Sequence, residues 1–316
     1  MHRTTFLPGL IRRLRPLALA AVLLGGVMPI QAGNGEPAVW EPTTPALDRT
    51  ERARLEAGLA ALAPQRPGLT DMYVLGVAGD SAEDVFRNEV AYLQDLFGQR
   101  MGSRGRTLAL VNHPERTGTA AIATWESLGE ALDALGRTLD PDEDVLFLYM
   151  TSHGLEDSSF YLQTAPGQED VITPEDLAQL LDEAGIGNAV IVVSACYSGG
   201  FVPVLASPQR LVITAARHDR PSFGCGNTDS ATWFGRAFLV EALNQTADFV
   251  AAFEQARSKV ARREQEQGEL PSEPQLHAGE DILPVLARWR STLAGTPPLP
   301  YPFEHVPPDA AAAPPP

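Results

Sequence analysis

A histidine and a cysteine each follow directly after a continuous apolar run. His153 belongs to the stretch VLFLYMTSHG at residues 145–154, and Cys196 ends the stretch AVIVVSAC at residues 189–196. A thiolate can attack a carbonyl carbon, and an imidazole can deliver a proton to the leaving amine. Backbone amides beside such a pair stabilise the oxyanion, and those of Gly154 and Cys196 are the natural donors. The pair therefore predicts acyl transfer through a thioester.

Each of the two residues also has a simpler interpretation. A lone histidine at a strand end is more often a structural hydrogen-bonding group, and a lone cysteine there is more often a packing residue. Cys225 is the only other cysteine of the chain, so a disulfide between Cys196 and Cys225 is a further alternative for an exported protein. A catalytic thiol has to stay free, and we therefore expect Cys225 to be a packed pocket residue.

The elements around the pair place both residues at one edge of a sheet. The pattern predicts strands over 71–79, 106–112, 145–150, 188–194 and 209–215, and helices over 82–98, 119–139, 174–184, 230–243 and 247–267. The strands lack polar–apolar alternation, which is typical of a parallel sheet covered on both faces. The predicted fold class is α/β, a three-layer αβα sandwich with a mostly parallel sheet. Ligands bind beyond the carboxyl ends of such strands, where His153 and Cys196 would meet.

The charge and composition of the chain exclude several classes of partner. A net charge of −16 argues against electrostatic binding of nucleic acid or of anionic lipid. No histidines have the spacing of metal ligands and no phosphate-binding loop is present, so we expect neither metal nor cofactor. The acidic run at 140–144 is interpreted as a solvated loop, with a calcium site as the alternative. We expect a monomer that acts on a peptide or protein substrate.

At this point the chain resembles a known group, the legumain family of caspase-like cysteine peptidases. This family includes the asparaginyl endopeptidases and the catalytic subunit of the GPI transamidase. The resemblance is carried by MYVLGVAG at 72–79, LFLYMTSHG at 146–154, VVSACYSGG at 192–200 and VITAARHDRPSFGCG at 212–226. It implies a caspase-like fold, a catalytic dyad of His153 and Cys196, and an oxyanion site at Gly154.

The resemblance also implies a substrate pocket, in which this chain departs from the family. The family has an acidic residue two positions before the nucleophile, where this chain has Ser194, and Val85 replaces the asparagine that orients the histidine. Arg87 falls at the position of the family's pocket arginine, which favours an acidic or amide P1 side chain; a solvated helix residue is the alternative. Ser222 and Cys225 are expected to line the same pocket.

The ends of the chain differ from its centre. Residues 1–32 have the basic and apolar layout of a secretory signal, which predicts a secreted or periplasmic protein without a stable membrane anchor after cleavage. An uncleaved anchor is the alternative. We interpret 33–68 as a linker or pro-segment with one helical patch, and 69–268 as the caspase-like domain. Residues 269–316 are interpreted as an extension whose proline-rich tail has too little apolar content to pack.

The predicted function is that of an exported cysteine endopeptidase that works through a thioester acyl-enzyme. A transpeptidase or transamidase is the alternative within the same chemistry, because an amine can resolve the acyl-enzyme in place of water. A catalytically silent caspase-fold binding protein is the alternative from another class. The presence of both His153 and Cys196 argues against it, since binding alone does not require the two residues.

Overall fold

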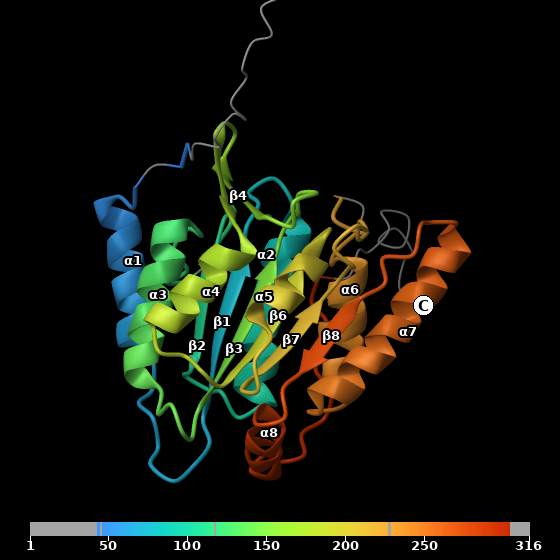
Figure 1. Ribbon diagram of the computed structural model, residues 1–316. Coiled ribbons are helices and arrows are strands. Elements are labelled where there is room, and N and C mark those ends of the chain that lie inside the picture. The colour runs from blue at the N-terminus through green and yellow to red at the C-terminus, as the bar shows by residue number, and fades with distance from the viewer. Residues whose placement is uncertain (1–42, 45, 117, 227–228, 304–316) are drawn as a thin grey trace, which may run out of the picture. The chain divides into compact units, whose positions relative to one another are not determined.

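The computed structural model describes residues 43–44, 46–116, 118–226 and 229–303. Its centre is a six-stranded sheet with the strand order β2-β1-β3-β6-β7-β8. The strands are β1 Met72–Ala78, β2 Thr107–Val111, β3 Val145–Thr151, β6 Ala189–Ser194, β7 Arg210–Thr214 and β8 Gln275–Ala278. All neighbouring strands run parallel except β7 and β8, which are antiparallel (Figure 1).

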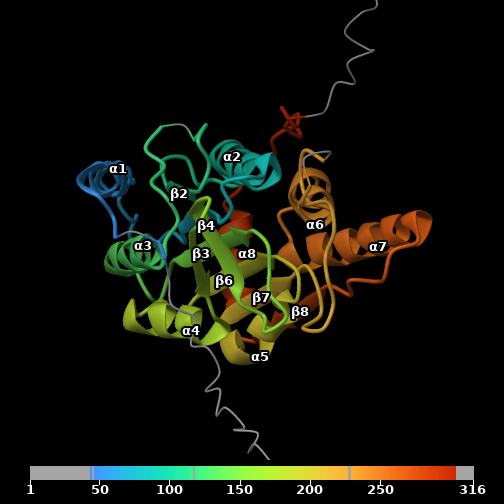
Figure 2. The ribbon, with the colours of Figure 1, turned by 90° about the horizontal axis from the view of Figure 1, so that it is seen from above.

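Helices cover both faces of this sheet, as the view in Figure 2 shows. One side carries α1 Arg49–Ala60, α3 Trp125–Thr138, α4 Pro174–Glu183 and α5 Phe201–Leu205. The other carries α2 Asp84–Gln99, α6 Trp233–Gly235, the π-helical η2 Arg236–Leu243, α7 Phe249–Gln267 and α8 Ile282–Ser291. The three-layer αβα sandwich with a mostly parallel sheet is therefore confirmed.

The strands are buried on both faces. Every residue of β1, β3 and β6 is buried. In β1, Met72 and Val74 pack into the cluster under α2, α7 and α8, whereas Tyr73 and Leu75 pack into the cluster under α1, α3 and α4. This two-sided burial explains why these strands show no polar–apolar alternation in the sequence.

The pattern missed a small hairpin between β3 and α4. Its strands are β4 Phe160–Ala165 and β5 Gln168–Ile172, which pair antiparallel and stand apart from the main sheet. Figure 1 shows the hairpin rising above the edge where the parallel strands end. The turn contains Pro166 and Gly167, and Gly167 has a φ of 77°. A Pro-Gly pair is a turn signal, so the sequence did contain a sign of this hairpin.

The boundary drawn at residue 68 is wrong, because the segment before it contributes to the core. The predicted helical patch is α1, and its Leu55 is 1% exposed. Arg52 on this helix forms ion pairs with Glu126 and Glu130 on α3.

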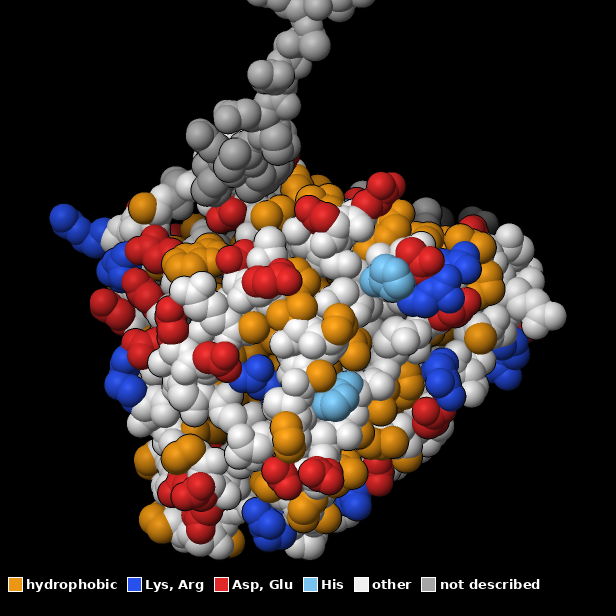
Figure 3. All heavy atoms as spheres, viewed as in Figure 1, with side chains coloured by type: hydrophobic (Ala, Val, Ile, Leu, Met, Phe, Trp, Pro, Cys, Tyr) orange, Lys and Arg blue, Asp and Glu red, His pale blue; other side chains and the backbone are white. Residues whose placement is uncertain are grey.

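On the face shown in Figure 3, acidic and basic side chains lie interspersed around apolar ones.

The C-terminal extension is also part of the domain. β8 pairs with β7, and Trp289 on α8 is 2% exposed. Residues 297–303 have no regular secondary structure, yet the buried Tyr301 donates a hydrogen bond of 2.6 Å to the carbonyl of Ser230. The expectation that the tail does not pack is therefore wrong for these residues.

The expected signal at 1–32 and the end of the tail at 304–316 lie outside the described residues. Within the residues that are described, no helix combines the length and apolar content needed to cross a membrane.

A buried carboxylate on α2 joins three elements beneath the carboxyl edge of the sheet. Glu89 accepts hydrogen bonds from the Tyr149 hydroxyl at 2.8 Å and the Thr151 hydroxyl at 2.7 Å. The amide and hydroxyl of Thr232 each donate to its other oxygen at 2.7 Å. Burial raises the pKa of Glu89, and these hydrogen bonds oppose that shift. Both carboxyl oxygens are thus fully used in holding α2, β3 and the start of α6 together.

Glu89→Gln should lower the free energy of unfolding by about 2 to 3 kcal/mol, because an amide nitrogen would face groups that donate hydrogen bonds. Urea denaturation followed by circular dichroism measures this loss. The exposed Asp95 on the same helix supplies the control, and Asp95→Asn should stay within about 0.5 kcal/mol of the wild type. Equal stability of the Glu89→Gln variant and the wild type would contradict this role.

Candidate active site

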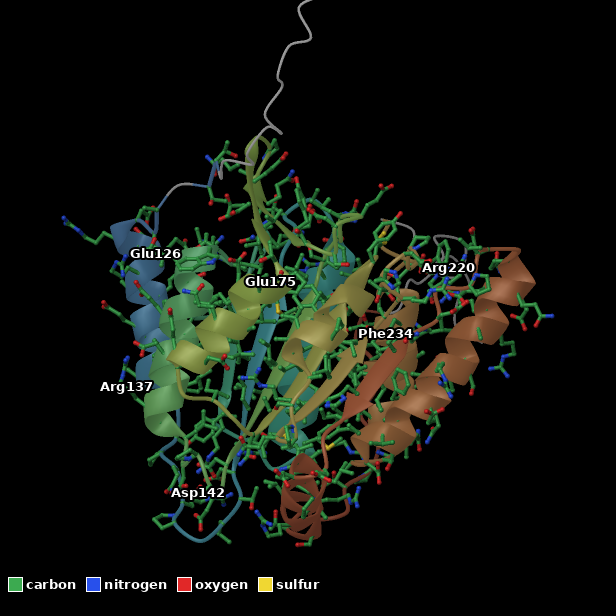
Figure 4. All side chains as sticks on the ribbon, viewed as in Figure 1. Glu126, Arg137, Asp142, Glu175, Arg220 and Phe234 are labelled. Atoms are coloured by element: carbon green, nitrogen blue, oxygen red, sulfur yellow. The ribbon has the colours of Figure 1, made fainter. Side chains whose placement is uncertain are left out.

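The pairing of β3 with β6 places His153 and Cys196 at the same level of the sheet. The two strands are parallel, and Thr151 is paired with Ser194. His153 and Cys196 each lie two positions beyond these paired residues, so both sit past the same carboxyl edge. This is the upper edge in Figure 1, whereas Figure 4 shows Asp142 at the lower one.

The backbone of Gly154 packs directly against Cys196. A Cβ atom built at Gly154 would overlap the carbonyl oxygen of Cys196, and it would also lie 3.1 Å from the Cys196 nitrogen. Only glycine allows this approach without a shift of one of the two loops. The contact holds the histidine loop and the cysteine loop together.

Two backbone amides beside the thiol have no partner in the part of the chain that the structure describes. Among the described residues, no acceptor receives a hydrogen bond from the N–H of Gly154 or from the N–H of Cys196. Most backbone amides in proteins are paired, so two unpaired donors next to one thiol are unusual. Such donors can stabilise an oxyanion that forms at the carbon bound to sulfur.

The thiol of Cys196 contacts the loop that follows β7. Its Sγ accepts a hydrogen bond from the amide of Ser222 at 3.2 Å and donates to the carbonyl of Ser222 at 3.4 Å. Cys196 is partly exposed, so the residue lies where a substrate can approach it. Ser222 is thus the predicted pocket residue that the structure places directly at the thiol.

The turn after the nucleophile is fixed by its backbone. Tyr197 adopts a left-handed conformation with φ of 55°, and its amide donates to the carbonyl of Arg220 at 2.8 Å. Arg220 is labelled in Figure 4 near this edge of the sheet. The nearby Arg217 forms ion pairs of 2.5 Å with Asp219 and with Glu273. These contacts hold the loop after β7 in place, and the turn at Tyr197 is bonded to that loop.

The imidazole of His153 is held by ring packing. It lies edge-on to Phe86 with 5.3 Å between ring centroids, and 6.4 Å from the ring of Tyr161. Within the described part of the chain, neither ring nitrogen has a hydrogen-bond partner, and no hydrogen bond joins the ring to Cys196 Sγ. Both nitrogens are therefore available to exchange a proton with a substrate.

Cys225 is a free thiol, as is Cys196, so the structure contains no disulfide between them. Cys225 packs against the apolar cluster that includes Val85 and Phe86. Burial raises the pKa of Cys225 to about 11, and the nearby Cys196 adds to the shift. Cys225 therefore lies near the nucleophile as a protonated thiol.

Two other predicted pocket residues are already engaged. Ser194 is 1% exposed, and its hydroxyl lies 3.3 Å from that of Thr232. Arg87 forms ion pairs with Asp84 at 3.1 Å and with Glu115 at 2.6 Å. These pairs fit neither a solvated helix residue nor an arginine that is free to bind an acidic P1 side chain. The charge of Arg87 is already balanced by two carboxylates.

The acidic run at 140–144 is not simply solvated. Asp144 is 1% exposed, and its carboxylate accepts hydrogen bonds from the amides of Asp71 at 2.8 Å and Asp140 at 2.9 Å. Burial raises the pKa of Asp144. No group of three or more His, Cys, Asp or Glu side chains suited to a metal ion occurs in the described ranges. The acidic run therefore stabilises the turn that precedes β3 through the hydrogen bonds of Asp144.

One acidic residue near the histidine was missed by the sequence reasoning. Glu83 directly precedes α2, and its Oε2 atom is buried without a hydrogen-bond partner among the described residues. A polar residue directly before a helix is expected to be an N-cap. The sequence pattern therefore did not indicate another role for Glu83.

Comparison with known proteins identifies a family. The model of the Peptidase C13 family, which is the legumain family, matches residues 129–284. The matched segment contains both His153 and Cys196, and it confirms the resemblance drawn from the sequence motifs. The match supports a cysteine peptidase function. A search of the curated proteins found no match to the chain.

Gly154→Ala should reduce peptide cleavage at least about tenfold and lower the free energy of unfolding by about 1 to 3 kcal/mol, because the added methyl group forces the two loops apart. Gly98→Ala is the control, since nothing lies within 4 Å of a Cβ atom built at that helical position. That variant should be as active as the wild type and up to about 1 kcal/mol more stable. Wild-type activity in Gly154→Ala would contradict the inferred contact.

Alkylation of Cys225 by iodoacetamide at pH 8 should be at least about a hundredfold slower in the folded protein than in urea. With a pKa of about 11, only about one Cys225 thiol in a thousand is ionised at that pH. The rate should rise as the pH approaches 11. Peptide mapping of the wild type by mass spectrometry, which resolves Cys225 from Cys196, measures the rate. Equal rates in the folded and unfolded states would contradict the raised pKa.

Proposed function

Because residues 129–284 belong to the Peptidase C13 family, we propose that the protein is an exported cysteine endopeptidase that uses Cys196 as nucleophile and His153 as general acid and base. The observation that carries the proposal is the arrangement around the thiol. Cys196 lies beside two amides that have no hydrogen-bond partner within the described ranges, and His153 follows the adjacent strand at the same level. A thiol, an imidazole and two free N–H donors are the groups that acyl transfer requires.

The proposed reaction proceeds in two halves. His153 accepts the thiol proton of Cys196 as the sulfur attacks the scissile carbonyl carbon, and the amides of Gly154 and Cys196 donate hydrogen bonds to the oxyanion. His153 delivers a proton to the leaving amine as the C–N bond breaks, which leaves a thioester on Cys196. A water molecule then gives a proton to His153 and attacks the thioester. The acid product leaves, and the thiol is restored.

The substrate pocket that we propose lies on the side of Ser222. The Ser222 amide contacts the sulfur, and Cys225 follows in the same loop. Arg87 is balanced by Asp84 and Glu115, so it adds little net positive charge for an acidic P1 side chain. The pocket is therefore assigned to Ser222 and Cys225, with the buried Ser194 as support behind it.

Export, the monomeric state and a peptide or protein substrate complete the proposal. Export rests on the composition of residues 1–32. The net charge of −16 supports a substrate other than nucleic acid.

Cleavage of a diverse peptide pool under reducing conditions tests the dyad. Cys196→Ala and His153→Ala should each lower the cleavage rate at least about a thousandfold, because either change removes a group that takes part in bond breaking. Gly98→Ala, which adds a methyl group where nothing lies within 4 Å, is the control and should keep the activity of the wild type. Mass spectrometry of the products gives the cut sites.

Adding a peptide with a free amino terminus distinguishes hydrolysis from transfer. Hydrolysis predicts free acid products alone, whereas ligated products would favour the transpeptidase alternative. An inactive wild-type protein whose Cys196 also fails to react with a thiol-reactive peptide probe would contradict both, and would favour a binding protein.

A further inference from the structure

We infer that the protein has a second binding site, a cavity at the amino edge of the sheet that takes a small organic anion with an apolar body. The cavity has a volume of about 510 Å³, and small-molecule sites typically measure about 300 to 1,000 Å³. It includes Met72, the first residue of β1, and the end of α8, which lies at the lower edge of the sheet in Figure 1. The candidate dyad lies beyond the opposite edge, so the cavity is separate from the proposed active site.

The walls of the cavity come from segments that are far apart in the sequence and are joined to one another. They are the loop before β1, the end of α2 with the loop that follows it, and the segment from the end of α8 onward. A Cβ atom built at Gly102 would lie 3.1 Å from a methyl carbon of Leu293. The Nε of Arg100 donates a hydrogen bond of 3.2 Å to the hydroxyl of Thr296. The cavity is therefore formed before any ligand binds.

The cavity has more cationic than anionic groups. Arg66, Arg100 and Arg104 line it, and Asp71 is the one carboxylate among the described residues that do so. The side chain of Asp71 is 1% exposed and pairs with Arg66 at 2.6 Å and with Arg106 at 3.3 Å. The single negative charge of Asp71 is thus shared between two guanidinium groups.

Two of the arginines have no carboxylate partner. Arg100 donates to the side-chain oxygen of Asn244 at 2.7 Å and to Thr296, which are both neutral, and within the described residues it forms no ion pair. Arg104 is exposed and has neither a hydrogen bond nor an ion pair in the part of the chain that the structure describes. On a protein with a net charge of −16, such uncompensated cations are unexpected. Their remaining N–H groups can bind the carboxylate or phosphate of a ligand.

The negative groups near the cavity do not cancel this charge. The carboxylate of Glu143 accepts a hydrogen bond from the Gly68 amide at 2.8 Å, and the buried Asp144 accepts one from the Asp71 amide at 2.8 Å. Burial also raises the pKa of Asp144. The C-terminal ends of α2 and α8 each add a partial charge of about −0.5, which together is less than the charge of the two arginines without a carboxylate partner.

An apolar wall lies beside these cations. Leu69 lines the cavity and is 45% exposed, and Leu293 is partly buried against the core. Met72 and Trp289 are buried at the base. Covering an exposed leucine with an apolar group is favourable, and an inorganic anion would leave Leu69 in water. The ligand therefore combines one anionic group with an apolar body.

Isothermal titration calorimetry of the purified protein with two probes, 4-phenylbutyrate and phenyl phosphate, tests this site. Both should bind saturably with a Kd below about 1 mM, and the uncharged 4-phenylbutanol should bind at least about tenfold more weakly. Tighter binding of phenylbutyrate would identify a carboxylate ligand, and tighter binding of phenyl phosphate a phosphate ligand. The affinity for both anions should fall as the salt concentration rises.

Two variants locate the binding. Arg104→Gln should weaken both anions about fivefold and leave the alcohol unaffected, because it removes one exposed charge. Leu69→Glu should weaken the anions at least about tenfold, because it adds a negative charge and removes an apolar contact. The matched controls are Arg49→Gln, at an exposed arginine on α1, and Leu270→Glu, at a leucine that is 49% exposed outside the cavity. Both controls should bind as the wild type does.

Three results would overturn the inference: no saturable binding of either anion, equal affinity for the alcohol, or unchanged binding in both Arg104→Gln and Leu69→Glu. The Cys196→Ala variant should bind the anions as the wild type does. Calorimetry measures this binding without peptide cleavage, so a failure of the proposed peptidase function leaves the result unaffected.

Discussion

The close approach of Gly154 to the backbone of Cys196 is the contact on which the site depends. Parallel pairing of β3 with β6 aligns Thr151 with Ser194, and the chain leaves both strands at the same level. The histidine loop can then pack on the cysteine loop only because Gly154 has no side chain. The geometry of the candidate dyad therefore follows from strand register and one glycine, and the helices on both faces serve to keep that register.

Polar groups at this edge fall into two kinds. Glu89, Ser194 and Arg87 are fully engaged with other residues, and they fix the supporting framework. The amides beside the thiol, the ring of His153 and the Oε2 atom of Glu83 lack hydrogen-bond partners within the described residues. Buried polar groups are normally paired, so unpaired groups that gather at one edge are a sign of function.

The sequence was sufficient to predict the elements whose pattern results from two-sided burial. Five strands of the main sheet, and the place of His153 and Cys196 beyond two of them, follow from apolar runs and their ends. β8 was missed because its residues are only partly buried or exposed, which leaves no apolar run to detect. The pairing of Arg87 with Glu115 depends on a contact across the fold, and no local spacing encodes it.

The most direct measurement of the central claim is covalent labelling with a peptidyl acyloxymethyl ketone, mapped by tandem mass spectrometry. This reagent reports a thiolate that attacks carbon beside bound peptide, so it tests nucleophile and binding site together. The account predicts one label per molecule, located on Cys196, and a strong loss of labelling when His153 is replaced by alanine. Labelling of Cys225 in place of Cys196, or labelling that does not depend on His153, would contradict it.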